Sequence, residues 1–406
     1  MFKTVDELPG EQSVLMRVDL NSPIENGAAQ DNSRFEHHAE TIRRLLNDDH
    51  RLALLAHQGR PGGDSFVSLR SHADILSTYL DGDVTFVPET YGDRAMDAIH
   101  NLDAGEVLLL ENTRMTPDEL PEKSPEDHAK SEFVQTLAPE FDVFVNDAYS
   151  VAHRGHASTV GFPPVMPAYA GPVMTAEYEH NTRIAEREFD GPVSMLVGGT
   201  KATDVIGVMH ALGDKVDTFY MGGIAGELFL RGAGYPVGYD VDGTALFDEQ
   251  WEENRTTIES LLDEYGEQIE LPRDLAYEDA DGERAEIAVD AIEEKTTSYL
   301  DVGSQTVAEY SAKLQDSDAV FVKGAFGLFE DERFATGTVG MLETIAELDC
   351  FSVVGGGDTS RAVDLYDLDA SSFSHVSIAG GAYLGALTGD PLPAIEALEL
   401  AAARCQ

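Results

Sequence analysis

The stretch Cys350–Thr359, CFSVVGGGDT, decides how this chain is expected to fold. A short apolar run leads into three glycines, then an acid and a hydroxyl, and the residues that follow have helical spacing. This pattern predicts a buried parallel strand that turns into a helix at the glycines. Glycines let an anion approach the backbone closely, and the helix N-terminus offers it unpaired N–H groups. A plain helix cap is the competing interpretation.

Four further strands in the second half of the chain also end in glycine, and a helical pattern follows each of them. These strands span Val193–Gly199, Thr218–Gly223, Ala319–Gly324 and His375–Gly381. Alternating strands and helices predict a parallel sheet, which binds ligands at the carboxyl ends of its strands. Lys201, just past the first of these strands, would supply the cation that a polyphosphate needs. The second half is therefore expected to hold a nucleotide.

The first half alternates in the same way, but its strands end in polar and basic residues. The expected strands are Val14–Asn21, Leu52–Ala56, Val107–Leu110 and Phe141–Asn146. At their ends or in adjoining loops lie Asp19, Asn21, Arg34, His57, Arg60, Arg114, His153, Arg154 and His156. Several arginines at one edge of a sheet form a positive site suited to a small phosphorylated or carboxylated substrate. For any one arginine, a surface ion pair is the competing interpretation.

Two segments interrupt the alternation of strands and helices. Residues Ala170–Asp190 have a polar, charged helical pattern, which predicts a helix connecting two domains or a solvated surface helix. Thr244–Ile292 contains an acidic helical pattern and then a DADGE turn typical of a hairpin, and we expect no catalytic role for it. The predicted fold class is α/β, with two doubly wound, Rossmann-like parallel-sheet domains joined by a hinge helix.

The composition excludes several classes of partner. The 406 residues include 75 acids and 27 bases, which gives a formal net charge of −48. Nucleic acids and anionic membranes are therefore poor partners, because their phosphates would be repelled. Of the 27 bases, eight are lysines and 19 are arginines. A surface so acidic and poor in lysine is typical of proteins that stay soluble in concentrated salt, so we expect a halophilic protein.

Cysteine content and apolar runs predict a soluble cytoplasmic protein. Cys350 and Cys405 are too few for a disulfide scaffold or a zinc cluster, and both are expected to be reduced. The first residues, MFKTVDELPG, have no apolar core of a signal peptide, and no apolar run is long enough to span a bilayer.

In their order along the chain, these strand ends resemble the phosphoglycerate kinase family, from about Val14 to the C-terminus. The resemblance rests on motifs at Arg17–Asn21, His57–Pro61, Leu108–Arg114, Val145–Ser158, Gly198–Lys201, Gly327–Thr338, Gly355–Thr359 and His375–Ala382. It implies a halophilic, archaeal-type member of the family. The implied reaction is the reversible transfer of the acyl phosphate of 1,3-bisphosphoglycerate to ADP with Mg²⁺, giving 3-phosphoglycerate and ATP in glycolysis and gluconeogenesis.

The resemblance also implies a division of labour. Residues 1–172 would bind 3-phosphoglycerate, completed by about 387–406, with 173–190 as the interdomain helix and 191–386 as the nucleotide-binding domain. In the first domain, Asp19 and Asn21 would orient the triose, and Arg34 would meet the substrate carboxylate and the transferring phosphoryl group. The remaining predicted substrate residues would hold the non-reacting phosphate: His57, Arg60, Arg114 and Arg154.

For the nucleotide, the resemblance implies Lys201, Lys323, Glu330, Gly355, Gly356, Gly357, Asp358 and Thr359. Glu330 would bind the ribose hydroxyls and Asp358 would bind Mg²⁺. The implied catalytic set is Arg34, Lys201, Gly356 and Gly380. No general base is required, because the attacking oxygen is already an anion, so catalysis is expected to consist of alignment and charge neutralisation during in-line transfer on domain closure. A monomer is expected.

The sequence departs from the family pattern at a few positions. Val205 stands where many members have a second lysine, and Lys323 and Ala325 replace an asparagine and a proline. Ser377–Ala379 replaces a serine-threonine-glycine run. We hypothesise that Lys323 restores the charge missing at Val205; drift at tolerant positions is the alternative. Two other functions compete: a catalytically silent nucleotide-binding protein, disfavoured by the retained charged residues, and an acetate-kinase-like enzyme, which would not need three arginines for a second phosphate.

Overall fold

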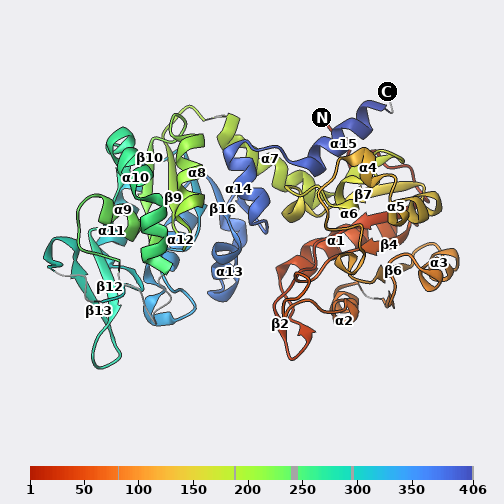
Figure 1. The fold of residues 1–406 in the computed structure, drawn as a ribbon, viewed down its shortest axis with the longest axis horizontal. Helices are drawn as coiled ribbons and strands as arrows, with labels where there is room; N and C mark the ends of the chain where they lie inside the picture. Colours follow the sequence, from red (N-terminus) through yellow and green to blue (C-terminus); the bar gives the residue numbers. More distant parts are fainter. Residues whose placement is uncertain (81, 187–188, 239–245, 294–296, 405–406) are drawn as a thin grey trace. The chain divides into compact units, whose positions relative to one another are not determined.

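The computed structural model describes residues 1–406 except 81, 187–188, 239–245, 294–296 and 405–406. The chain divides into two compact units (Figure 1). Unit 1 is Met1–Glu179 together with Pro391–Gln406, and unit 2 is His180–Asp390. The chain therefore passes from unit 1 to unit 2 and returns once.

Unit 1 is built on a six-stranded parallel sheet with the order β5-β6-β4-β1-β7-β8. Its strands are β1 (Ser13–Arg17), β4 (Arg51–Leu55), β5 (Val84–Val87), β6 (Val107–Leu110), β7 (Val143–Asn146) and β8 (Ala168–Ala170). Its helices are α1 (Ser33–Asn47), α2 (Arg70–Tyr79), α3 (Asp93–His100), α4 (Pro125–His128), α5 (Glu132–Leu137) and α6 (Ala157–Val160). Every residue of β1 is buried, because neighbouring strands flank it on both sides and helices cover its faces.

Unit 2 repeats this plan with the order β11-β10-β9-β15-β16-β17. Its strands are β9 (Val193–Val197), β10 (Thr218–Met221), β11 (Ile269–Glu270), β15 (Ala319–Lys323), β16 (Phe351–Gly355) and β17 (His375–Val376). Its main helices are α8 (Ala202–Leu212), α9 (Gly223–Gly232), α11 (Ser304–Leu314), α12 (Thr336–Ala346), α13 (Gly357–Leu365) and α14 (Gly381–Thr388). The predicted fold class of two doubly wound parallel sheets is confirmed.

The first strand ends earlier than the sequence pattern predicts. The expected strand ran to Asn21, but β1 ends at Arg17. The backbone then leaves the ladder because side chains take over its hydrogen bonds: the Asp19 N–H donates to His38 Nε2 at 3.1 Å. Asp19 and Asn21 therefore lie in the loop after the strand, where their side chains are held by other residues of unit 1.

The predicted connecting helix is shorter than the charged stretch suggests. Ala170 belongs to β8, and α7 spans Pro172–Glu186. Asp147 caps the helix, since its Oδ1 accepts hydrogen bonds from the N–H groups of Val173 at 2.9 Å and Met174 at 3.2 Å. Pro172 is the first residue of the helix, a position that suits proline because the N–H that proline lacks would have no partner within the helix.

The predicted insertion contains the helix and the hairpin that its sequence suggested. Helix α10 (Leu246–Tyr265) packs on α9 (Figure 1). Strands β12 (Asp274–Glu278) and β13 (Arg284–Ala288) pair in antiparallel fashion, and β14 (Asp301–Val302) pairs with the other edge of β12. A small apolar core supports the insertion: Leu230, Val237, Leu275, Val289 and Ile292.

Both ends of the chain lie in unit 1. The last helix, α15 (Pro393–Arg404), packs on β8 and α6. The Ala394 N–H donates to the Ala152 carbonyl at 3.1 Å, and the N-terminal amine of Met1 lies 2.9 Å from Glu399 Oε1. The C-terminal segment thus completes a unit that begins at the first residue.

Cys350 has a free thiol, and burial raises its pKa to about 11, so the thiol stays protonated. Cys405 lies outside the described residues. Among the helices in the described part of the chain, none is both long and apolar enough to cross a membrane.

Candidate active site

In unit 1, Asp19 and Arg34 form the centre of a polar site. Arg34 Nε lies 3.1 Å from Asp19 Oδ2, and Ser150 Oγ donates to the same oxygen at 2.5 Å. Burial would raise the pKa of Asp19, but the charge of Arg34 together with His57 and the hydrogen bonds from Ser150 and the Asn21 N–H outweighs it and holds that pKa well below its usual range. Asp19 is therefore ionised and keeps the arginine oriented.

Two buried side chains, His38 and Asp147, fix the position of Asp19. His38 Nε2 accepts from the Asp19 N–H, so its Nδ1 is the protonated nitrogen and donates to Asp147 Oδ2 at 3.1 Å. The other oxygen of Asp147 caps α7. A chain of hydrogen bonds thus connects the loop after β1 to the N-terminus of α7, and sequence reasoning did not predict His38 or Asp147 as part of it.

Asn21 joins this loop to the next strand end. Its side-chain oxygen accepts from the Gly59 N–H at 2.9 Å, and its backbone carbonyl accepts from Arg34 Nη1 at 2.6 Å. Gln58 bridges the same loops, because its Oε1 accepts from the Ser22 N–H at 2.8 Å. The ends of β1 and β4 are thus cross-linked by polar groups.

A basic cluster lies beside these loops in unit 1. Arg17, fully buried at the end of β1, donates to His57 Nδ1 at 3.0 Å. Burial, then the charges of Arg17 and Arg154, lower the pKa of Arg114 to about 10, and the charge of Arg60 acts in the same direction. The predicted residues His57, Arg60, Arg114 and Arg154 therefore lie close enough to share one electrostatic site.

The positive charges of this basic cluster repel one another, so a bound anion would stabilise it. Arg114 Nε is buried and meets no hydrogen-bond acceptor among the described residues. Burial lowers the pKa of both His153 and His156 to about 4, so these rings are neutral at neutral pH. A phosphate dianion would supply both countercharge and acceptors.

A buried acid that the sequence analysis missed balances part of this charge. Glu119 is fully buried and accepts from Ser158 Oγ at 2.6 Å, and Ser158 Oγ in turn accepts from Arg17 Nε at 2.9 Å. Arg17 could have been found from sequence, because an arginine inside the apolar run VLMR must have a buried partner. Glu119 has no such signal, since it lies in a loop among other acids.

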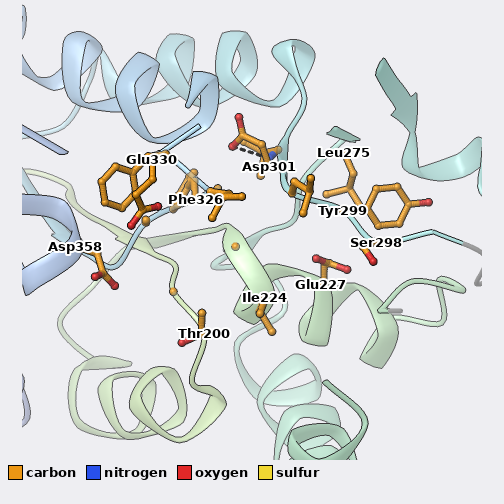
Figure 2. A pocket seen from close by; sticks show the side chains of 18 of the residues that line it. Thr200, Ile224, Glu227, Leu275, Ser298, Tyr299, Asp301, Phe326, Glu330 and Asp358 are labelled. Atoms are coloured by element: carbon orange, nitrogen blue, oxygen red, sulfur yellow. Dashed lines mark hydrogen bonds between the residues drawn. The ribbon is translucent and has the colours of Figure 1, made fainter. Parts of the chain in front are cut away.

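In unit 2, a cavity of about 460 Å³ opens at the carboxyl ends of the sheet strands. Residues that follow β9, β10, β15 and β16, in loops or in the first turns of helices, form most of its wall, and Figure 2 shows several of them. The lining residues include Gly199, Thr200, Gly223, Ile224, Ala325, Phe326, Glu330 and Asp358. Phe247 and Leu275 also line it, so the insertion, for which we expected no catalytic role, forms part of the cavity wall.

Three helices begin at this edge of the sheet. Thr200 lies two residues before α8, Gly223 is the first residue of α9, and Asp358 lies in the first turn of α13. Each helix N-terminus presents unpaired N–H groups and partial positive charge, which favours an anion such as a polyphosphate. Lys201, the N-cap residue of α8, is exposed beside them.

The glycine run that opens the sequence analysis forms the turn from β16 into α13. Gly355 ends the strand, Gly356 has φ 104°, a conformation that favours glycine, and Gly357 begins the helix. Thr359 is buried, and its hydroxyl donates to the Gly355 carbonyl at 2.5 Å. Gly380 lies at the same edge of the sheet, just before α14.

Lys323 ends β15, next to the strand end of β9. Its Nζ lies 2.8 Å from Asp204 Oδ2 in the first turn of α8, and its side chain is largely buried. Val205 is fully buried in the same turn. Lys323 therefore places a positive charge beside the helix turn that contains Val205.

Glu330 and Asp358 lie toward one end of the cavity (Figure 2). Glu330 Oε1 lies 3.0 Å from Arg361 Nη1 on α13. The described residues contain no group of three or more potential metal ligands. A Mg²⁺ ion that comes with nucleotide phosphates needs only one or two protein carboxylates, so the exposed Asp358 fits that requirement.

Comparison with known proteins agrees with this arrangement. The family model described as phosphoglycerate kinase matches residues 6–390. The chain belongs to the phosphoglycerate kinase family. Its relatives include the phosphoglycerate kinase of Halorubrum lacusprofundi, 69% identical over 99% of both chains, and that of Haloarcula marismortui, 64% identical over 98% of this chain and 99% of the relative.

The fold agrees as well. The crystal structure of phosphoglycerate kinase from Pyrococcus horikoshii has 30% sequence identity, covers 99% of both chains and superposes with a TM-score of 0.92. Within each unit, the residues that the family resemblance implied lie at one edge of a sheet. The resemblance to a halophilic, archaeal phosphoglycerate kinase is confirmed.

Proposed function

We propose that unit 1 binds 3-phosphoglycerate or 1,3-bisphosphoglycerate and that unit 2 binds ATP or ADP with Mg²⁺. The family gives the reaction class, a glycolytic kinase that transfers phosphate to a carboxyl group. What supports the assignment of ligands is the contrast between the sites: a basic cluster in unit 1, and a cavity edged by helix N-termini in unit 2.

For the triose, we propose that His57, Arg60, Arg114 and Arg154 hold the non-reacting phosphate. The buried Arg114 Nε would gain an acceptor from it. Asp19 and Asn21 orient the triose, and Arg34, fixed by Asp19, meets the carboxylate and the transferring phosphoryl group. Because Asp19 is ionised, Arg34 keeps its side chain in place before substrate arrives.

For the nucleotide, we propose that Gly355, Gly356, Gly357 and Thr359 form the turn that receives the phosphates. Lys201 and Lys323 supply countercharge, Glu330 accepts from the ribose hydroxyls, and Asp358 holds Mg²⁺, which would neutralise phosphate charge when bound. Gly356 and Gly380 leave the backbone open to the transferring group.

The chemistry requires alignment more than proton transfer. A carboxylate oxygen of 3-phosphoglycerate, or a phosphate oxygen of ADP, attacks phosphorus in line while the opposite P–O bond breaks. No proton moves, so no base is needed. Arg34 and Lys201 neutralise charge on the equatorial oxygens. We propose that a hinge movement at α7 brings the two ligands together and excludes water.

We further propose that the protein acts as a cytoplasmic monomer without nucleic-acid or membrane partners. The net charge of −48 supports the last two points, because it repels phosphate-rich surfaces.

The test is a coupled assay of ATP consumption with 3-phosphoglycerate and Mg²⁺ in molar KCl. Arg34→Ala should lower kcat by about 100-fold or more, since it removes charge from the transferring group. Arg44→Ala is the matched control, because Arg44 lies on the same helix, is exposed and pairs with Asp6 at the surface.

Equal activity of both variants would contradict the role of Arg34. A different result would favour the alternative of a catalytically silent nucleotide-binding protein: a wild-type chain that binds ADP but turns over no substrate at low or molar KCl.

A further inference from the structure

Glu119 is a buried acid of unit 1 that the proposed chemistry does not use. Its side chain is fully buried. Its Oε1 accepts from Thr113 Oγ1 at 3.1 Å and from Ser158 Oγ at 2.6 Å, and its Oε2 accepts from the Ser158 N–H at 2.8 Å. These donors offset the cost of burying a carboxylate. Ser158 supplies two of them, so Glu119 fixes both the backbone and the hydroxyl of Ser158.

Ser158 connects Glu119 to Arg17. Its hydroxyl proton is used in the hydrogen bond to Glu119, so its oxygen is left to accept from Arg17 Nε at 2.9 Å. Arg17 is fully buried, which lowers the pKa of its guanidinium, and the charge of Glu119 is the strongest effect in the opposite direction. Glu119 therefore orients Arg17 through Ser158 and also supplies its main countercharge.

Arg17 in turn determines which nitrogen of His57 carries a proton. Arg17 Nη2 lies 3.0 Å from His57 Nδ1. A guanidinium can only donate, so Nδ1 accepts, and the proton of the neutral ring lies on Nε2. Burial, and then the charge of Arg17, lower the pKa of His57 well below its usual range, so the ring is neutral. Within the described part of the chain Nε2 has no hydrogen-bond partner, so its N–H is left for a ligand.

The position of this proton matters for a phosphate ligand. With the proton on Nε2, His57 donates to a phosphate oxygen. With the proton on Nδ1, that nitrogen would face the N–H of Arg17, and Nε2 would present a lone pair to the phosphate, so two acceptors would meet. Only the first tautomer suits both neighbours, and a guanidinium held in one orientation selects it.

We propose that Glu119 is a positioning residue for the non-reacting phosphate of the triose. It acts through Ser158 and Arg17, and it fixes His57 in the tautomer that donates from Nε2. This proposal rests on the proposed function, in which His57 contacts that phosphate. The phosphate stays bound in the ground state and in the transition state alike, so loss of the tautomer should raise KM and leave kcat unchanged.

Ser158→Ala removes the hydroxyl that connects Glu119 to Arg17 but keeps the backbone N–H. In molar KCl it should raise KM for 3-phosphoglycerate by about tenfold, as the loss of one hydrogen bond to a charged group would, with kcat within about twofold of wild type. Thr113→Val is the matched control, because it removes the other hydroxyl on the same Glu119 oxygen, outside the connection to Arg17, and should keep the wild-type KM.

Glu119→Gln should raise KM in the same way. An amide has one oxygen, and if that oxygen accepts from the Ser158 N–H, its NH₂ group faces the Ser158 hydroxyl, which then has no acceptor there. Glu122→Gln is its control, since Glu122 lies three residues further along the same loop and is exposed. If Glu119→Gln does not fold, Ser158→Ala and Thr113→Val decide.

A second readout needs no substrate. NMR spectra of protein labelled with ¹⁵N in histidine distinguish the two tautomers, and the signals of His57 are those that His57→Gln lacks. Wild type and Thr113→Val should show a proton on Nε2 alone. Ser158→Ala and Glu119→Gln should show a mixture of tautomers, which a purely structural role of Glu119 would not produce.

Three results would overturn the proposal: a proton on Nδ1 of His57 in the wild-type chain, an unchanged tautomer and KM in Ser158→Ala, or an equal rise in KM in Thr113→Val. Absence of turnover of 3-phosphoglycerate by the wild-type chain would instead contradict the proposed function. The tautomer is measured without substrate, so the two failures are distinguishable.

Discussion

Lys323, the last residue of β15, and Asp204, in the first turn of α8, form an ion pair with 2.8 Å between Nζ and Oδ2. Lys323→Asn should raise KM for both ADP and ATP by about tenfold, because one charge-assisted contact to phosphate is lost. Asp204→Asn should lower both values, since it releases the lysine from its partner. Steady-state kinetics with each nucleotide measure both effects.

Lys313→Asn serves as the control for this prediction, because Lys313 on α11 pairs with Glu309 of the same helix and with Glu270 of β11, and none of these residues lines the cavity. Unchanged KM values in Lys323→Asn would mean that the lysine has only a structural role beside Val205.

For single residues, sequence motifs predicted the candidate site residues at strand ends, but not the side chains that hold these residues in place. Asp19 and Arg34 follow recognisable patterns. His38 and Asp147 come from α1 and the end of β7, more than 100 positions apart, and meet only because β1 pairs with β7.

Among the elements, α7 depends on one capping residue from another strand end. Asp147 accepts from the first N–H groups of the helix and from His38. Asp147→Ala should lower the free energy of unfolding by about 2–3 kcal/mol, because a buried cap and a buried histidine donor both lose their partner. Urea denaturation in molar KCl measures the loss.

Ser124→Ala is the comparison, since Ser124 caps α4 at an exposed site and its removal should cost about 1 kcal/mol or less. Equal losses in the two variants would show that the Asp147 network adds nothing to an ordinary cap.

Element types were easier to predict than element ends. The apolar runs of β6 and β15 are buried on both faces, so their strands match the predicted ranges closely. The edge strands β5, β8 and β11 were not predicted, because edge positions tolerate polar residues and shorten the apolar run. The insertion lines the cavity only through tertiary contacts of Phe247 and Leu275, which no local pattern reveals.

For the whole molecule, the net charge of −48 predicts dependence on salt. Repulsion among acids opposes folding in dilute buffer, and salt shortens its range to a few ångströms. We expect Tm to rise by roughly 10 °C or more between dilute buffer and molar KCl, as a gain of several kcal/mol would produce. Scanning calorimetry measures this shift.

Sucrose at the same osmolality is the control, since it acts on hydration without screening charge. A Tm that stays constant or falls in KCl would contradict a halophilic protein.

The general architecture followed from sequence because strand and helix patterns alternate along nearly the whole chain. Strands that end in glycine in the second half of the chain, and strands that end in basic residues in the first half, predicted two sheets with different ligands. What alternation does not reveal is strand order: β1 lies between β4 and β7, and β9 lies between β10 and β15, because crossovers return the chain to the sheet centre.

The position of α15 in unit 1 has a consequence for synthesis on the ribosome. Unit 2 is one continuous segment that is synthesised before α15. Unit 1 remains without the helix that packs on β8 until α15 has been made. Unit 2 therefore folds from one uninterrupted stretch of the chain, whereas unit 1, whose first segment is synthesised earliest, is complete only after Pro391–Gln406 has left the ribosome.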